Sequence, residues 1–184
     1  SSMKTVYFDI ETIPCQLPGV RDEYIAAVQA PAKYSKPESI AEWLRENREA
    51  EGEAAWLKTS FDGGVGQACC IGLAVDDEAP RSYQIPADAI GNRNHEAEVL
   101  MNFFSDLTSI GRGVLVGHNI IGFDLPFIWK RCMVLGVKPP LWFPRNPSKY
   151  SSETVRDTML MWDQDQRAGA GMDRLCKLLG IPGK

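Results

Sequence analysis

The sequence predicts an α/β domain in which a mixed sheet is flanked by helices. Apolar and polar residues alternate in several short segments, as they do in strands with one buried face. In longer segments the apolar residues recur at helical spacing instead. Strands come first along the chain and then alternate with helices, an order expected of an α/β protein with a mixed sheet. The 184 residues are enough for one domain with a sizeable core.

The first strand is expected at residues 4–11. Val6, Phe8 and Ile10 alternate there with polar or amphipathic neighbours, and Pro14 ends the pattern. Further strands are expected at residues 67–76, which are largely buried, at 81–85, paired antiparallel to them, and at 114–116. Residues 154–162 contain either a short strand or the start of a helix.

A long polar stretch, residues 14–66, separates the first two strands. About 50 residues are more than an ordinary connection needs. Apolar residues among many Glu and Arg predict an amphipathic helix over residues 38–58. We therefore expect an inserted, partly helical subdomain at 14–66, within a single domain that spans residues 1–184.

The remaining helices follow from apolar residues at helical spacing. Leu100, Phe103 and Leu107 mark a helix over residues 95–110 that packs on the sheet. Further helices are expected at residues 123–135 and 172–179, and Gly180 and Pro182 end the last of them.

Charge and cysteine content narrow the class of protein. The net charge of −4 is uneven, because residues 1–110 are acidic and residues 111–184 carry a basic excess that could meet phosphates. No apolar run approaches the roughly 18 residues that a membrane span needs. The five cysteines form no C-x-x-C pair, so we expect reduced thiols in a cytoplasmic protein and no zinc site.

Two carboxylates stand near the end of the first strand. Asp9 and Glu11 are two residues apart, so they point to the same face of that strand with Cα atoms roughly 6.5 Å apart. Mg²⁺ or Mn²⁺, which prefer carboxylate oxygen, would relieve their repulsion. A solvated polar face on an edge strand is the alternative interpretation.

A second group of polar residues follows the strand at 114–116. His118 and Asn119 lie in the loop, and Asp124 opens the next helix. Each has an ordinary structural interpretation as well. Asp124 could be a helix N-cap, His118 a hydrogen-bonded loop residue and Asn119 a turn residue.

Together these segments resemble the DEDD-type 3′-5′ exonucleases. Asp9-x-Glu11 resembles their first motif, D-x-E, and Asn119-x-x-x-Phe123-Asp124 resembles their second, N-x-x-x-[FY]-D. The string from His118 to Asp124 is most similar to the editing exonucleases of family B DNA polymerases and their stand-alone relatives. The resemblance implies a ribonuclease-H-like fold and covers most of residues 4–11 and 67–180.

The resemblance also implies roles for individual residues. Asp9, Glu11 and Asp124 would be catalytic and would hold two Mg²⁺ or Mn²⁺ ions. The resemblance further implies that four residues contact the substrate. These are Thr12 and Ile13 near the terminal sugar and base, Asn119 near the scissile phosphate, and His118 on the same surface.

The third motif of that family, Y-x-x-x-D or H-x-x-x-x-D, is not found after Asp124. Tyr150 is followed by Thr154 where the motif needs an aspartate, and no histidine follows His118. Asp157 could supply a fourth acid, although a helix N-cap is the favoured interpretation. We expect the third motif beyond Lys184, and residues 1–184 alone to be inactive or weakly active.

A Pro-rich loop offers a possible contact to single strands. It contains Trp142 and Phe143, followed by Arg145 and Lys149, and aromatic side chains can stack on bases. Core packing is the alternative interpretation for most of the tryptophans.

The function expected from these patterns is hydrolysis of single-stranded 3′ ends with release of 5′-mononucleotides, with DNA favoured over RNA. Three alternatives remain at this point. They are an exonuclease of short RNA or RNA 3′ ends, a nucleic-acid-binding module without catalysis, and a protein-interaction domain that keeps only the fold. No membrane partner is expected, and association with a polymerase or repair protein is left open.

Overall fold

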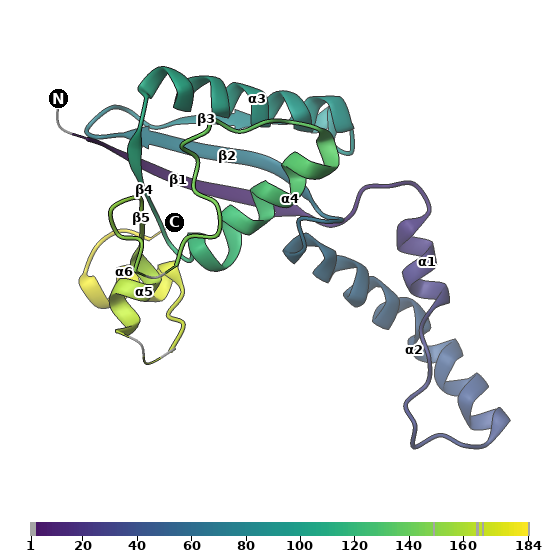
Figure 1. The fold of residues 1–184 in the computed structure, drawn as a ribbon. Helices are drawn as coiled ribbons and strands as arrows, with labels where there is room; N and C mark the ends of the chain where they lie inside the picture. Colours follow the sequence, from purple (N-terminus) through teal and green to yellow (C-terminus); the bar gives the residue numbers. More distant parts are fainter. Residues whose placement is uncertain (1–2, 149, 165, 167, 184) are drawn as a thin grey trace.

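The computed structural model describes residues 3–148, 150–164, 166 and 168–183. Its centre is a five-stranded sheet with strand order β3-β2-β1-β4-β5 (Figure 1). The strands are β1 (Lys4–Ile13), β2 (Gln67–Val75), β3 (Arg81–Gln84), β4 (Gly113–Gly117) and β5 (Val155–Asp157). The first three are antiparallel neighbours, whereas β4 pairs parallel to β1 and β5 parallel to β4. The predicted mixed α/β class is therefore confirmed.

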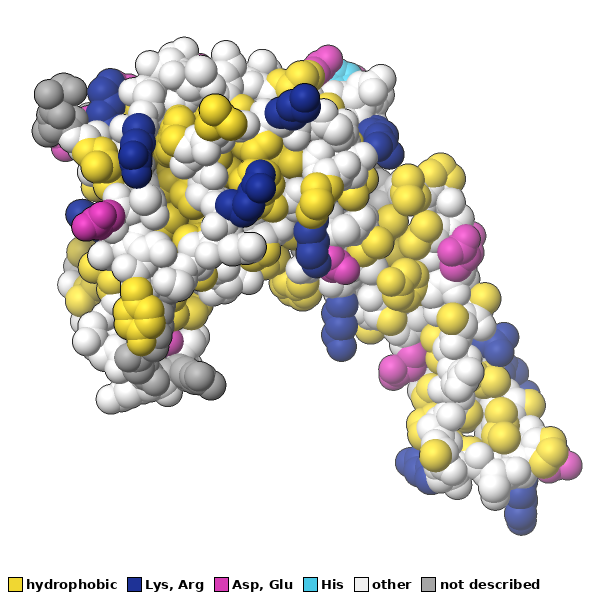
Figure 2. Space-filling view, viewed as in Figure 1, with side chains coloured by type: hydrophobic (Ala, Val, Ile, Leu, Met, Phe, Trp, Pro, Cys, Tyr) yellow, Lys and Arg dark blue, Asp and Glu magenta, His cyan; other side chains and the backbone are white. Residues whose placement is uncertain are grey.

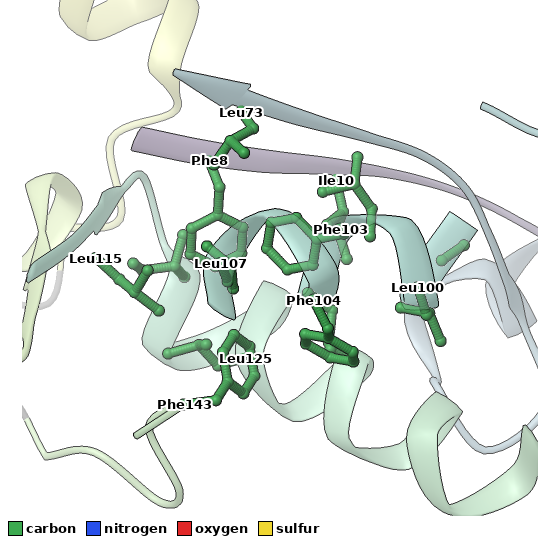
Figure 3. Close-up of a cluster of buried hydrophobic side chains, with 14 of the residues drawn as sticks. Phe8, Ile10, Leu73, Leu100, Phe103, Phe104, Leu107, Leu115, Leu125 and Phe143 are labelled. Carbon is green, nitrogen blue, oxygen red and sulfur yellow. The ribbon is translucent and has the colours of Figure 1, made fainter. Parts of the chain in front are cut away.

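The hydrophobic core lies on one face of this sheet, under α3 (Arg93–Ile110) and α4 (Leu125–Leu135). Figure 3 shows Phe8 and Ile10 of β1 among Phe103, Phe104 and other side chains of this cluster. Val6, Phe8 and Ile10 are at most 5% exposed, whereas Tyr7, Asp9 and Glu11 are exposed on the opposite face. The strand alternation thus sends the apolar residues into the core and the two acids away from it.

The C-terminal part of the chain lies on the other side of the sheet. Residues 154–162 contain both a strand and a helix start, because β5 leads directly into α5 (Thr158–Asp163). After α5 comes α6 (Met172–Leu179), whose residues line a groove together with β1 and β2. Figure 1 shows α5 and α6 together, on the side of the sheet away from α3.

The insertion between β1 and β2 forms a helical arm that projects from the body (Figure 1). It consists of α1 (Val20–Ala26), α2 (Pro37–Leu57) and a 3-10 turn, η1 (Lys58–Phe61). The two helices meet where α2 has Gly52, because a Cβ there would lie 2.4 Å from the Cα of Ile25. The expected helix of residues 38–58 is α2, and α1 is an additional short helix.

A buried ion pair fixes the root of this arm to the body. Arg131 of α4 donates to both carboxylate oxygens of Glu96 in α3, at 2.6 and 2.7 Å. Glu96 also accepts the Ala68 amide of β2 at 3.0 Å, and Arg131 donates to the Gly63 carbonyl at 3.2 Å. One charged pair thus joins two helices, a strand and the returning end of the arm.

All five cysteines are free thiols. Within the part of the chain that the structure describes, no helix combines the length and apolar character that crossing a membrane requires.

Candidate active site

The candidate site lies where β1 is no longer paired with β4. β4 pairs with β1 only from Lys4 to Tyr7, whereas β2 follows β1 as far as Ile13. Beyond Tyr7, the edge of β1 that faces β4 is therefore not covered by a strand. Asp9 and Glu11 lie on this part of β1.

A glycine lets the chain turn away at this point. A Cβ on Gly117, the last residue of β4, would lie 2.7 Å from the Phe8 carbonyl oxygen and 2.4 Å from the Ile120 Cγ2. Only a residue without a side chain permits both contacts. Asn119 then adopts a left-handed conformation, with φ 58°, and a π-helical turn, Ile120–Asp124, leads into α4. Single π-helical turns of this kind are frequent at functional sites.

This turn places the Asp124 carboxylate against the open edge of β1. Its Oδ2 accepts the Ile10 amide at 3.1 Å, and Asp124 is 3% exposed. Ile10 lies between Asp9 and Glu11, so the hydrogen bond joins the two sequence motifs. Asp124 precedes α4 in the position of an N-cap, but its side chain makes no capping hydrogen bond. The N-cap interpretation therefore does not describe what this side chain does.

Burial and a neighbouring charge raise the pKa of the Asp124 carboxyl. Burial is the largest cause that raises the pKa of its carboxyl from 3.8 to about 7, and the negative charge of Asp9 is the next. The hydrogen bond from Ile10 opposes this shift in pKa, whereas Asp157 adds a small contribution to it. A buried carboxylate beside another one is stabilised by a proton or a cation.

Asp157 supports the same loop from β5. Its carboxylate caps α5 by accepting the Met159 amide at 3.0 Å, so the N-cap interpretation is confirmed. The same carboxylate also accepts the Asn119 amide at 2.9 Å and the Ile121 amide at 3.0 Å. Sequence reasoning missed these bonds because they join residues 36 and 38 positions apart.

His118 and Asn119 make contacts within the protein. The His118 Nδ1 lies 2.9 Å from the Thr158 Oγ1, and its Nε2 lies 2.7 Å from the Ala170 carbonyl oxygen. The ring therefore holds β4 to the segment before α6, which is the hydrogen-bonded loop interpretation. A Cβ on Gly122 would lie 2.5 Å from the Asn119 Oδ1, so the Asn119 side chain lies close to the π-helical turn.

Thr12 and Ile13 lie where β1 enters the arm. The Thr12 Oγ1 donates to the Ser60 carbonyl at 2.7 Å, and Ile13 pairs with Gln67 at the end of the ladder. Both side chains are partly buried. Substrate contact by these two residues, like that by His118 and Asn119, stays a prediction.

A divalent cation fits the chemistry of the donors at this site. Burial and the neighbouring charge of Asp9 raise the pKa of Asp124, and carboxylate oxygens are ligands that Mg²⁺ and Mn²⁺ prefer. Among the described residues, however, no three His, Cys, Asp or Glu side chains are close enough together to hold a metal ion. Convergence of Asp9, Glu11 and Asp124 on one metal site remains a prediction.

An apolar groove that the sequence patterns did not predict adjoins Asp9. Its volume is about 890 Å³, and it lies between the exposed face of the sheet and α5 and α6. Met161, Trp162 and Met172 line it and are each more than a third exposed. The apolar residues at helical spacing in residues 172–179 were the available signal.

The Pro-rich loop packs on the body. Phe143 is 3% exposed and lies in the core, and Trp142 packs against the core. The Trp129 Nε1 donates to the Pro144 carbonyl at 2.6 Å, and the Arg145 guanidinium lies over the Trp129 ring at 4.8 Å. Core packing therefore describes Phe143 and Trp142, while Lys149 lies outside the described residues.

The fold and the arrangement of motifs define a DEDD-type exonuclease domain with a ribonuclease-H-like fold. The chain belongs to the family described as predicted 3′-5′ exonucleases related to the exonuclease domain of PolB, whose model matches residues 65–184. Asp124 lies within the matched part, whereas Asp9, Glu11 and nearly all of the arm precede it. No curated protein sequence matches the chain.

Solved structures match this chain at low sequence identity. The family B DNA polymerase of the archaeon Pyrobaculum calidifontis is 16% identical with a TM-score of 0.58, and the match covers 100% of this chain and 19% of the polymerase. E. coli Exonuclease I in complex with a 5cy-dT13 oligonucleotide is 10% identical with a TM-score of 0.49, covering 100% of this chain and 37% of that one. This chain thus spans well under half of either protein.

Proposed function

We propose that this chain forms the catalytic site of a 3′-5′ exonuclease that hydrolyses single-stranded DNA ends. The observation that carries the proposal is the hydrogen bond from Ile10 to Asp124, because it places a buried carboxylate of raised pKa beside the strand segment that bears Asp9 and Glu11. A buried acid with a perturbed pKa marks a candidate functional site. Membership of the exonuclease family gives the reaction class.

In the proposed mechanism Asp9, Glu11 and Asp124 would hold two Mg²⁺ or Mn²⁺ ions. Such ions lower the pKa of an attacking water and stabilise charge on a leaving 3′ oxygen. The water oxygen forms a bond to phosphorus, the bond from phosphorus to the 3′ oxygen breaks, and that oxygen gains a proton. The products are a 5′-mononucleotide and a strand shorter by one residue.

The chain's own residues orient these groups in the proposal. Ile10 fixes one oxygen of Asp124, and Asp157 holds the loop in front of it by accepting the amides of Asn119 and Ile121. Asn119 would then contact the substrate strand near the scissile phosphate. Thr12 and Ile13 would lie beside the terminal sugar and base.

The test is degradation of a 5′-labelled single-stranded DNA and an RNA of the same sequence, in Mg²⁺ and in Mn²⁺. It uses residues 1–184 and any longer product of the same gene. We expect the longer product to shorten the strand from its 3′ end in a metal-dependent way, faster on DNA, and to lose this activity in Asp124→Asn, whereas residues 1–184 alone should show weak or no activity. Equal degradation by the longer product and its Asp124→Asn variant would contradict the proposal.

Two other outcomes identify the alternatives. Faster shortening of the RNA would reassign the substrate to RNA 3′ ends. Tight binding of the oligonucleotide by every form of the protein, without cleavage, would indicate a binding module.

A further inference from the structure

Phe61 is the exposed member of the phenylalanines in this chain. It lies in η1 at the root of the arm and is 71% exposed. The chain has seven phenylalanines, of which Phe123 is partly buried and five are at most 4% exposed, namely Phe8, Phe103, Phe104, Phe127 and Phe143. Singly exposed apolar side chains are common on protein surfaces, so the exposure of Phe61 gains meaning only from its position and its contacts.

The exposed ring is held in place. Its edge contacts the Phe123 ring, with centroids 6.3 Å apart and planes at 67°. Residues on both sides of Phe61 are fastened, since Ser60 accepts from Thr12 at 2.7 Å and Asp62 pairs with Lys130 at 2.8 Å. A ring fixed before binding loses little conformational freedom when a ligand stacks on it.

The position of Phe61 connects it with both motifs of the proposed active site. Phe123 immediately precedes Asp124 in the second motif. Thr12, which fastens Ser60, immediately follows Glu11 in the first. Phe61 therefore contacts the second motif through Phe123, and its neighbour Ser60 contacts Thr12, which is proposed to lie beside the end of a substrate strand.

The charges around Phe61 favour a contact with a nucleobase over a contact with the phosphate backbone. The arm, residues 14–66, holds more Asp and Glu than Lys and Arg, so it offers little attraction to a phosphate backbone. Lys130, the neighbouring cation, is already paired with Asp62. An exposed aromatic ring, by contrast, can stack on any base through its π-face.

We propose that Phe61 is a base-stacking residue that receives an unpaired nucleobase at or near the 3′ end of a single strand. The proposal rests on the proposed function and adds a contact from the arm. The family match begins at residue 65, so Phe61 is a feature of this chain's insertion and not of the matched domain.

The test measures stacking without cleavage. Single-stranded DNAs carry the fluorescent base 2-aminopurine at one of the last three positions, and binding is followed in EDTA. We expect wild type to quench the fluorescence at one of these positions. Phe61→Ala should remove the quenching and weaken binding about 5- to 150-fold, the range for losing one base–aromatic stack. Phe61→Trp should keep both properties.

Two further variants make the result specific. Phe61→Leu keeps an apolar side chain without a π-face, so it should lose the quenching as Phe61→Ala does. Met133→Ala removes another exposed apolar side chain, 73% exposed on α4, and should change nothing. Unchanged quenching and affinity in Phe61→Ala would overturn the stacking role while leaving the proposed function intact. Absence of oligonucleotide binding by wild type would overturn both.

Discussion

The contact between the two sequence motifs depends on the hydrogen bonds of single residues. Sequence spacing indicated that Asp124 is either a helix cap or a metal ligand. It did not distinguish the two roles, because the carboxylate accepts from the Ile10 amide, which lies 114 residues earlier in the chain. The same holds for Asp157, where the N-cap was predictable from the local sequence and the bonds to Asn119 and Ile121 were not. Local chemistry is readable from a sequence, whereas contacts between distant segments need the fold.

The raised pKa of Asp124 predicts how stability depends on pH without metal. Between 3.8 and about 7 the folded chain keeps a proton that the unfolded chain has released, so the free energy of unfolding should fall as pH rises through this window. Asp124→Asn should remove that fall and raise the Tm at pH 7.5 in EDTA, by about 2–4 °C for each ~1 kcal/mol. Thermal melts from pH 4 to pH 8 measure it.

The matched control is Asp62→Asn. The Lys130 hydrogen bond lowers the pKa of Asp62, so this carboxyl contributes stability that is lost on acidification. Its removal should leave the fall in stability toward pH 7 in place. A wild-type Tm that rises steadily from pH 4 to pH 7.5 would contradict the assignment to Asp124.

Asp157 should act on the site through the loop it holds. Asp157→Ala leaves the amides of Asn119 and Ile121 without their acceptor, at a cost of about 1–3 kcal/mol for each one left buried and unpaired. We expect a lower Tm and also weaker Mn²⁺ binding in calorimetric titration, because Asp124 follows this loop. Asp157→Asn keeps one acceptor oxygen and should lie between wild type and Asp157→Ala. Weakened stability with unchanged Mn²⁺ affinity would show a purely structural role.

For whole helices and strands, too, features set by the local sequence were predictable and contacts between distant segments were not. The main helix of the arm was predictable from its amphipathic pattern, and so was the presence of an insertion. The short helix α1 was not, because seven residues are too few to establish a helical period. The root of the arm contacts Arg131, which pairs with Glu96, and this pairing of residues 35 positions apart has no signature in sequence.

Breaking the ion pair at the root should destabilise the chain more than replacing it. Arg131→Met leaves the Glu96 charge buried and unpaired, and we expect a loss of about 3–5 kcal/mol in the free energy of unfolding. The double replacement Arg131→Met with Glu96→Gln should recover part of this loss. Urea denaturation of the single and double variants measures both. Equal losses in the single and double variants would show that the unpaired charge is not the cause.

At the scale of the whole molecule, a projecting arm is joined to a compact body. Figure 2 shows an open notch between the arm and the part of the body below the sheet. The fold class followed from the order of elements, since strand and helix patterns are local. The apolar groove beside Asp9 did not, because it is formed by β1, β2, α5 and α6 together.

We propose that residues 1–184 form a single domain with the arm as an inserted subdomain, and proteolysis tests this. Trypsin should cut first after Lys33, which is exposed in the loop between α1 and α2, whereas Lys36 is followed by Pro37 and should resist. The nicked chain should stay associated, because its two pieces share the sheet, and should melt in one transition. A first cut within the body, or separate transitions for body and arm, would contradict the proposal.

The hydrogen bond between Ile10 and Asp124 places two separate demands on position 124. The backbone of β1 needs an oxygen there, since its edge has no neighbouring strand at that point, whereas the chemistry needs a charge. Asparagine meets the first demand and fails the second. A descendant of this domain that has given up catalysis but kept its shape should therefore carry Asn at this position more often than Ala or Val, which would leave the Ile10 amide without an acceptor.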